Sequence, residues 1–171
     1  MYTERSNIVL IGMPGSGKST AGVLLAKKMS KNFVDTDLLI QVSRNLSLQE
    51  IVNSFGHREF LKIEEKTLKK LRLENHVIAT GGSAVYSQPA MNILKTDGVI
   101  VFLDADLPSL KKRLTNFDSR GIARRPGQNL EDLFEERNRL YHMYADITVD
   151  CSDIAQDAVC GKIMEKLRAY E

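Results

Sequence analysis

The sequence predicts an α/β fold in which helices cover both faces of a parallel β-sheet. Short, uninterrupted apolar runs, such as residues 8–11 and 99–103, alternate with longer helix-like segments along the whole chain. Apolar strands of this kind are typical of parallel sheets that are buried on both faces. A glycine-rich turn joins the first apolar run to a helix-like segment, which is the setting of a phosphate-binding loop.

The first elements surround this turn. Residues 7–12 are predicted to form a buried strand, because residues 8–11 are all aliphatic. Residues 17–30 follow the glycines and are predicted to form a helix. A short strand is expected at residues 32–35.

The next elements are marked by capping and by glycine. Ser47-Leu48-Gln49-Glu50 is a capping box, in which serine and glutamate each bond the other's backbone N–H, so a helix should begin there and end near Gly56. A longer, charged helix is expected at 57–74. A strand at 76–80 should end at the pair Gly81 and Gly82.

The following segment repeats the strand and helix alternation. Pro89 suits the first turn of a helix that continues to about residue 95, because proline lacks the N–H that this position leaves unpaired. Residues 98–103 are apolar and predict a strand. Asp106 and Pro108 should open a helix that ends near residue 114.

The C-terminal part is predicted to hold one exposed loop and three regular elements. Residues 116–128 contain glycine, proline and arginine without an apolar period, which indicates a loop. Asn129 should cap a helix to about residue 143. The last strand is expected at 147–149 and the last helix at 155–170.

Length and composition predict one soluble domain. With 171 residues, 43% of them apolar and 27% charged, the chain is long enough to bury a core. The net charge of +2 gives no reason to expect a nucleic-acid partner. Residues 1–7 are polar and charged, and the first apolar run is too short for a signal peptide or a membrane span, so we expect a cytoplasmic protein with no membrane partner. Residues 1–171 are therefore interpreted as a single domain.

The glycine-rich turn has the pattern G-x-x-x-x-G-K-S, which predicts a nucleoside triphosphate site. Backbone N–H groups of such a turn and the positive end of the following helix hold the phosphates. Lys18 can reach the β- and γ-phosphates, and the Ser19 hydroxyl can bind Mg²⁺. The residues expected to hold the nucleotide are Gly12, Gly15, Ser16, Gly17, Lys18, Ser19 and Thr20.

Two aspartates follow the second strand and suit the remaining chemistry of phosphoryl transfer. If residues 35–37 are extended, Asp35 and Asp37 point to the same side. Asp35 would then serve Mg²⁺, which takes only one or two carboxylates in most proteins. Asp37 would accept a hydrogen bond from the acceptor hydroxyl or remove its proton.

Taken together, these features resemble the shikimate kinase family, which lies within the nucleoside monophosphate kinase-like branch of P-loop folds. The resemblance covers nearly the whole chain, to about residue 168. Its motifs beyond the phosphate loop are Phe33-Val34-Asp35-Thr36-Asp37, Glu59-Phe60-x-x-Ile63-Glu64-Glu65, Thr80-Gly81-Gly82-x-Ala84-Val85, Arg125-Pro126 and Arg137-x-x-Leu140-Tyr141.

The resemblance implies a P-loop kinase with a three-layer α/β/α fold, a five-stranded parallel sheet and a mobile lid at residues 116–128. The reaction that it implies is the ATP- and Mg²⁺-dependent phosphorylation of shikimate to shikimate 3-phosphate. Asp37, Gly82 and Arg137 would contact the acid substrate, with Gly81 beside them. Asp35 and Ser19 would serve the metal.

The same resemblance implies that two arginines contact the nucleotide. Arg125 would move with the lid onto the phosphates as a catalytic residue, together with Lys18 and Asp37. Arg113 would lie beside the adenine, with residues 151–156 on its other side. A local charge excess agrees with a lid that closes over polyphosphate, since a guanidinium can hold two phosphate oxygens at once. Residues 111–125 contain one acidic residue, Asp118, and six basic residues: Lys111, Lys112, Arg113, Arg120, Arg124 and Arg125.

Two positions depart from the family pattern. Leu61 stands where the family has an arginine that holds the substrate carboxylate. Arg58 lies three residues earlier, on roughly the same helix face, and is the candidate replacement in substrate binding. Ser83 stands where the family has a third glycine. Serine keeps the backbone N–H but adds a Cβ beside the substrate.

Two other functions remain open at this point. One is a related small-molecule kinase, for another polyol, hydroxy acid or nucleotide, which Leu61 would suit. The other is a nucleotide-binding module without catalysis. A GTPase is disfavoured because the sequence has no Asn-Lys-x-Asp motif. For the leading interpretation we expect a monomer that acts on a small hydroxyl compound.

Overall fold

The computed structural model describes residues 5–170. Within this range five parallel strands form one sheet in the order β2-β3-β1-β4-β5. Residue Val9 in the central strand pairs with Ile78 on one side and Ile100 on the other. The strands are β1 (Asn7–Ile11), β2 (Asn32–Asp35), β3 (His76–Ala79), β4 (Gly98–Asp104) and β5 (Ile147–Asp150). The α/β prediction and the five-stranded parallel sheet are confirmed.

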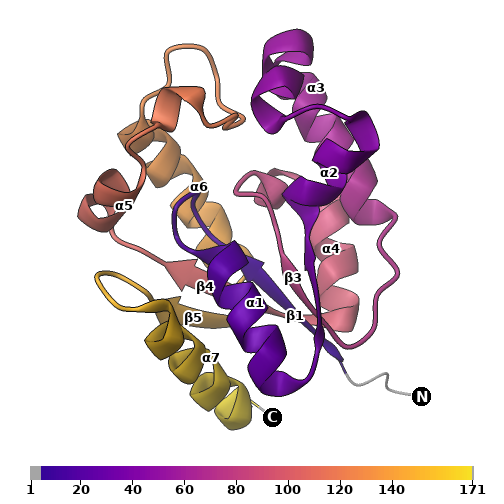
Figure 1. Cartoon of the computed structure of the whole chain (residues 1–171), viewed down its shortest axis with the longest axis vertical. Coiled ribbons are helices and arrows are strands. Elements are labelled where there is room, and N and C mark those ends of the chain that lie inside the picture. The colour runs from indigo at the N-terminus through magenta and orange to yellow at the C-terminus, as the bar shows by residue number, and fades with distance from the viewer. Residues whose placement is uncertain (1–4, 171) are drawn as a thin grey trace.

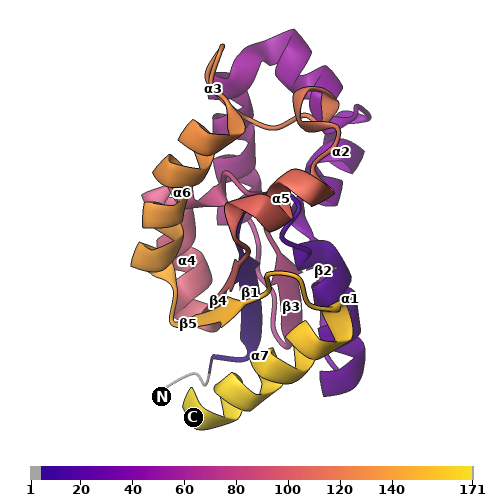
Figure 2. The same ribbon diagram turned by 90° about the vertical axis from the view of Figure 1, so that its left-hand side faces the viewer.

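Helices cover both faces of this sheet. Helices α1 and α7 pack on each other on one face, and α4 and α6 lie on the opposite face (Figure 2). The helices described are α1 (Lys18–Met29), α2 (Thr36–Arg44), α3 (Leu48–Lys69), α4 (Gln88–Asp97), α5 (Leu107–Arg113), α6 (Leu130–Tyr144) and α7 (Gln156–Tyr170). Two short 3₁₀ turns, η1 (Ala84–Tyr86) and η2 (Phe117–Ser119), lie between them.

The central strands explain why the core forms here. Val9, Leu10, Ile100 and Val101 have no exposed surface, because each lies in a strand with helices on both sides. A second, smaller apolar cluster lies between α2, α3 and the lid segment, which we define as residues 116–128, and includes Ile40, Phe60 and Ala123. The lid segment, orange in Figure 1, extends from α5 towards α3.

Helix α2 is the main element that the sequence pattern missed. The expectation of an extended segment at 35–37 is wrong, since Asp35 accepts hydrogen bonds from the backbone N–H groups of Asp37 and Leu38 and caps a helix that begins at Thr36. Leu38 and Val42 of this helix are exposed. The apolar residues of α2 therefore do not form a single buried face by which a sequence pattern would predict the helix.

The other boundaries follow the capping signals closely. The Ser47–Glu50 capping box is present at the start of α3. Gly56 interrupts that helix with φ 78° and ψ 165°, which separates the two helical segments that we expected. The second segment ends at Lys69 rather than at residue 74. No helix within residues 5–170 combines the length and apolar character that a membrane span needs.

Candidate active site

A cavity of about 330 Å³ opens at the carboxyl ends of the strands, between the phosphate loop and the lid segment. This is where ligands bind in open α/β sheets. The cavity is lined by the phosphate loop and α1 (Pro14, Gly15, Gly17, Lys18, Ser19, Thr20), by the strand ends and helices (Asp37, Leu48, Phe60, Thr80, Gly81, Gly82, Ser83, Arg113, Arg137) and by the lid segment (Arg120, Gly121, Ile122, Ala123).

The phosphate loop depends on glycine for its shape. Gly12 has φ 148°, and a Cβ there would approach the Leu103 carbonyl oxygen to 2.7 Å. Gly17 has φ 92° and directly precedes α1, so the loop delivers the N-terminus of that helix to the cavity. Ser16 is buried, and its hydroxyl has no hydrogen-bond partner among the described residues. The backbone is thus arranged as an anion-binding loop.

Lys18 is buried at the floor of this loop. Its Nζ donates hydrogen bonds to the carbonyl oxygens of Gly12 at 2.7 Å and Met13 at 2.9 Å. Burial lowers the pKa of Lys18 to about 8, and the carboxylate of Asp37 opposes this shift. A negatively charged phosphate would favour the protonated ammonium group further.

Ser19 and Asp35 form a pair of oxygen donors beside the loop. The Ser19 hydroxyl donates to Asp35 Oδ2 at 2.5 Å, while Asp35 Oδ1 caps α2. No group of three or more possible metal-binding side chains occurs within residues 5–170. Mg²⁺ commonly binds through few protein oxygens plus substrate phosphates. The donor set therefore fits Mg²⁺ held between the protein and a nucleotide.

Asp37 lies in the first turn of α2 and faces the cavity. Burial and the nearby charge of Asp35 raise its pKa to about 6, and Lys18, Arg120 and Arg137 act in the opposite direction. A carboxylate with a raised pKa accepts a proton more readily than an exposed aspartate does. Its place between the phosphate loop and the Gly81–Gly82 turn suits a base that acts on an acceptor hydroxyl.

Arg137 is a buried cation at the far end of the cavity. It is 1% exposed, and its Nη2 donates to the Ala123 carbonyl oxygen at 2.5 Å. Among the ion pairs of residues 5–170 none involves Arg137. A buried guanidinium without a carboxylate partner is a place where an anionic ligand gains a charge-assisted hydrogen bond.

The turn after β3 lies close to Arg137. A Cβ at Gly82 would approach Arg137 Nη1 to 2.8 Å, so glycine is needed there. The Tyr141 hydroxyl donates to the Gly82 carbonyl oxygen at 2.6 Å, and the Gly81 N–H donates to Thr36 Oγ1 at 3.2 Å. Both glycines line the cavity and present backbone groups to it.

Arg113 connects two loops at the nucleotide end. Its Nη2 donates to the Cys151 carbonyl oxygen at 3.0 Å and its Nη1 to the Gly15 carbonyl oxygen at 3.4 Å. The structure therefore brings Arg113 to the phosphate loop and to the start of the 151–156 loop.

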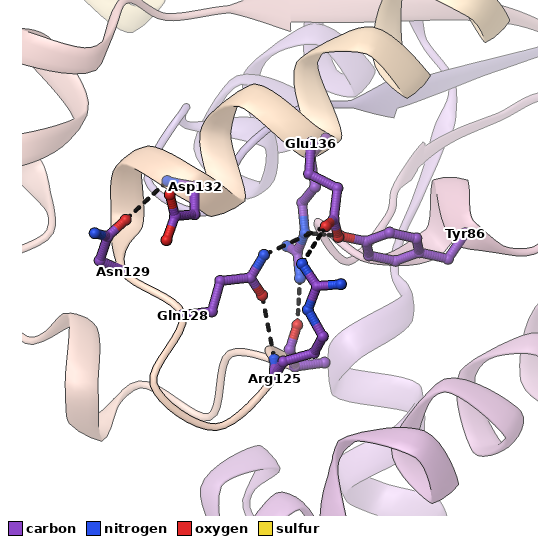
Figure 3. A network of polar contacts seen from close by, with 8 residues as sticks. Tyr86, Arg125, Gln128, Asn129, Asp132 and Glu136 are labelled. Carbon is purple, nitrogen blue, oxygen red and sulfur yellow. Dashed lines mark hydrogen bonds and ion pairs between the residues drawn. The ribbon is translucent and has the colours of Figure 1, made fainter.

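The lid segment presents a different arginine from the one that we singled out. Arg120 lines the cavity, and its charge acts on both Lys18 and Asp37. Arg125 instead lies on Glu136 of α6, with Nη2 to Oε2 at 2.7 Å, in the network that also holds Gln128 and Tyr86 (Figure 3). The sequence marked Arg120 only as part of a basic segment, because the motif match fell on Arg125.

Arg58 is not brought to the cavity. Its side chain is exposed on α3, and the cavity lining described above does not include it. Leu61 lines a smaller cavity of about 150 Å³ together with Glu64 and Ser83. Glu64, which we assigned no role, is 1% exposed and accepts a hydrogen bond from Ser83 Oγ at 2.5 Å.

Comparisons with known proteins agree with this geometry. The family model described as shikimate kinase matches residues 14–168. A shikimate kinase of Thermodesulfovibrio yellowstonii is 36% identical, with 94% of each chain covered. One of Sulfurihydrogenibium sp. is 32% identical over 95% of this chain and 98% of its own.

Solved structures give the same family. A shikimate kinase from Acinetobacter baumannii in complex with shikimate superposes with a TM-score of 0.90 at 27% identity, covering 99% of this chain and 97% of the other. The shikimate kinase of Aquifex aeolicus gives 0.82 at 35% identity, covering 95% and 96%. A deoxyadenosine kinase from M. mycoides, at 17% identity and a TM-score of 0.56, shares the fold alone over 95% and 99%.

Proposed function

The chain belongs to the shikimate kinase family, and we propose on this basis that it transfers the γ-phosphoryl group of ATP to a hydroxyl of shikimate, giving shikimate 3-phosphate and ADP. One observation carries this proposal. A single cavity has a phosphate loop at one end and, at the other, Asp37 beside the buried cation Arg137. The first end suits a triphosphate, and the second suits a hydroxyl compound with a carboxylate.

The reacting groups follow from this arrangement. The acceptor oxygen attacks the γ-phosphorus, the bond from phosphorus to the β–γ bridging oxygen breaks, and ADP leaves with that oxygen. Asp37 orients the acceptor hydroxyl and receives its proton. Lys18 and the lid arginine Arg125 stabilise the charge on the transferring group, which is usually the largest catalytic term. Residues 116–128 act as a mobile lid that excludes water during the transfer.

Nucleotide and metal contacts come from residues around the loop. Gly12, Gly15, Ser16, Gly17 and Thr20 bind the phosphates, and Arg113 lies beside the adenine. Ser19 and Asp35 would hold Mg²⁺, which neutralises phosphate charge when it is bound.

Acceptor binding relies on Arg137 and the Gly81–Gly82 turn. Arg137 pairs with the carboxylate of shikimate, while the glycines allow a close approach of the backbone. Arg58 is the remaining candidate for a second cation, through movement of its exposed side chain. Leu61 favours a second candidate function, the phosphorylation of a related polyol or hydroxy acid.

The working unit that we propose is a cytoplasmic monomer comprising the single domain 1–171, with small molecules as its partners.

The direct test is ADP release from MgATP with and without millimolar shikimate, with Lys18→Ala as the inactive control. We expect strong stimulation by shikimate and none in the variant. Absence of stimulation in a protein that still binds ATP would exclude shikimate and direct the assay to other polyols and hydroxy acids. Activity in Lys18→Ala would contradict the assignment of the phosphate loop.

A further inference from the structure

Both departures from the family pattern meet at one buried carboxyl group. Glu64 lies on α3, and Ser83 donates to its Oε2 from the turn after β3. Leu61 is three residues before Glu64, which places the two side chains on the same face of the helix. An arginine at position 61 would therefore be in reach of Glu64 as a charged partner. In this chain the neighbours are a leucine and a serine hydroxyl.

The surroundings of Glu64 favour its uncharged form. Burial raises the pKa of Glu64 to about 8, and the carboxylate of Asp37 adds to this effect. The hydrogen bond from the Ser83 hydroxyl lowers the pKa of Glu64, as do the charges of Arg137 from α6 and Lys18 from α1, but burial outweighs all three. The Glu64 carboxyl also lies near Tyr141 of α6. Among the described residues no ion pair involves Glu64.

The second oxygen of Glu64 lies at the edge of the acceptor site. Glu64 Oε1 is buried and has no hydrogen-bond partner among the described residues. A Cβ added at Gly81 would collide with both Glu64 Oε1 and Asp37 Oδ1. The two carboxyl groups thus flank the same glycine, and ionisation of Glu64 would place a second negative charge beside Asp37.

We propose that Glu64 and Ser83 are positioning residues for the acceptor, in which an uncharged Glu64 carboxyl bound by the Ser83 hydroxyl replaces an ion pair between Glu64 and residue 61. The contact holds the turn of residues 81–83 against α3, and with it the Gly81 and Gly82 backbone that faces the acceptor. It also leaves Asp37 as the one carboxylate beside Gly81. The proposal rests on the function proposed above, with an anionic acceptor.

The first experiment compares Ser83→Ala with Ser87→Ala. Ser87 is a matched control, because its hydroxyl also donates to a glutamate of α3, with 2.5 Å between Ser87 Oγ and Glu65 Oε2. Glu65 directly follows Glu64 in that helix. Loss of one hydrogen bond to a buried group should raise the KM for shikimate about fivefold to tenfold in Ser83→Ala. The kcat and the KM for ATP should stay near the parent values. Equal KM values for Ser83→Ala and Ser87→Ala would overturn the proposal.

The second experiment uses Glu64→Gln, which keeps the shape of the side chain and cannot ionise. In the parent enzyme the KM for shikimate should rise above about pH 8, where Glu64 becomes charged. Glu64→Gln should have a KM near the parent value at pH 7 and should lose this rise, whereas Glu65→Gln should retain it. A rise that persists in Glu64→Gln would contradict an uncharged positioning role.

The third experiment restores the charged partner. In a Leu61→Arg background an arginine can pair with Glu64, so replacing Ser83 by alanine should raise the KM less than it does in the parent chain. An equal rise in KM on Ser83→Ala in the parent chain and in Leu61→Arg would show that Leu61 and Ser83 act independently, which would refute the proposed replacement.

A further readout does not depend on the acceptor. Carbon-13 NMR of glutamate carboxyl groups follows the titration of Glu64 directly, with Glu64→Gln supplying the assignment. If shikimate proves not to be a substrate, the proposed function fails, while this titration still tests the uncharged carboxyl. A Glu64 signal that titrates like an exposed glutamate would overturn the inference even in an active enzyme.

Discussion

At the scale of single residues, the account depends on three side chains that line one cavity: two cations and one carboxylate. Lys18 is buried and donates to the carbonyl oxygens of Gly12 and Met13, Asp37 lines the cavity, and Arg137 is buried in its wall. Each has a distinct role in the proposed reaction, so their substitutions should affect different kinetic constants.

Replacement of Asp37 by asparagine should affect turnover. Asparagine keeps the size of the side chain but cannot accept the proton, so kcat should fall by at least about a hundredfold. The KM for ATP should change little, because Asp37 faces the acceptor. Steady-state kinetics with each substrate varied in turn measure both constants, and near-normal turnover would remove Asp37 from the mechanism.

Replacement of Arg137 by methionine should affect acceptor binding instead. A charge-assisted hydrogen bond to a buried anion is lost, so the KM for shikimate should rise by about a hundredfold. The affinity for MgADP, measured by calorimetry, should stay within about threefold of the parent. An unchanged KM for shikimate would show that the carboxylate binds elsewhere.

Stability should also depend on pH through Glu64. Its pKa is about 8 in the folded chain and 4.5 when exposed, so the folded state keeps a proton that the unfolded state releases between these values. The stabilising contribution is complete below pH 4.5 and is lost as the pH rises through 8. Relative to Glu64→Gln, the parent's free energy of unfolding should fall by up to about 1.4 kcal/mol per pH unit in this window. Urea unfolding at several pH values measures the slope, and parallel curves for the two proteins would contradict it.

At the scale of elements, the lid segment connects the two ends of the cavity. The Gly121 N–H donates to Gln49 Oε1 of α3 at 2.5 Å, and Arg137 of α6 donates to Ala123. In the same segment Arg120 lines the cavity, whereas Arg125 lies on Glu136 (Figure 3). Arg120 and Arg125, two of the three arginines of the lid segment, therefore occupy different positions.

Replacement of Arg120 by glutamine should lower kcat by about a hundredfold, because a positive charge near the transferring phosphoryl group is lost. Lys112→Gln is the control, since Lys112 belongs to the same basic segment but is exposed and pairs with Asp153. Single-turnover rates at saturating ATP separate this effect from nucleotide binding. Equal rates for the two variants would exclude Arg120 from the transfer step.

At the scale of the whole molecule, the sequence predicted the five-stranded sheet and most of the helices but missed helix α2. The apolar strands and the Ser47–Glu50 capping box are local signals, and the structure follows them. Helix α2 was missed because Asp35 was interpreted only as a metal ligand, although its other oxygen caps the helix. A side chain with two local roles cannot be recognised from spacing alone.

In the candidate site, too, residues in local motifs could be predicted from the sequence, whereas contacts between distant segments could not. The phosphate loop and Asp37 stand in contiguous motifs, so their residue types point to their chemistry. Arg120 and the contact between Glu64 and Ser83 depend on which segments the fold brings together, and no local pattern carries that information. Arg58 was chosen by helical spacing alone, and its side chain is exposed on α3 and does not line the cavity.

The central claim is that this fold transfers a phosphoryl group from ATP to a hydroxyl of shikimate. Phosphorus-31 NMR of a reaction with MgATP and shikimate tests it most directly, since it identifies the product as well as the consumption of ATP. The account predicts a phosphomonoester signal of shikimate 3-phosphate that grows in equal amount with ADP. Growth of inorganic phosphate with ADP, without any phosphomonoester, would contradict it.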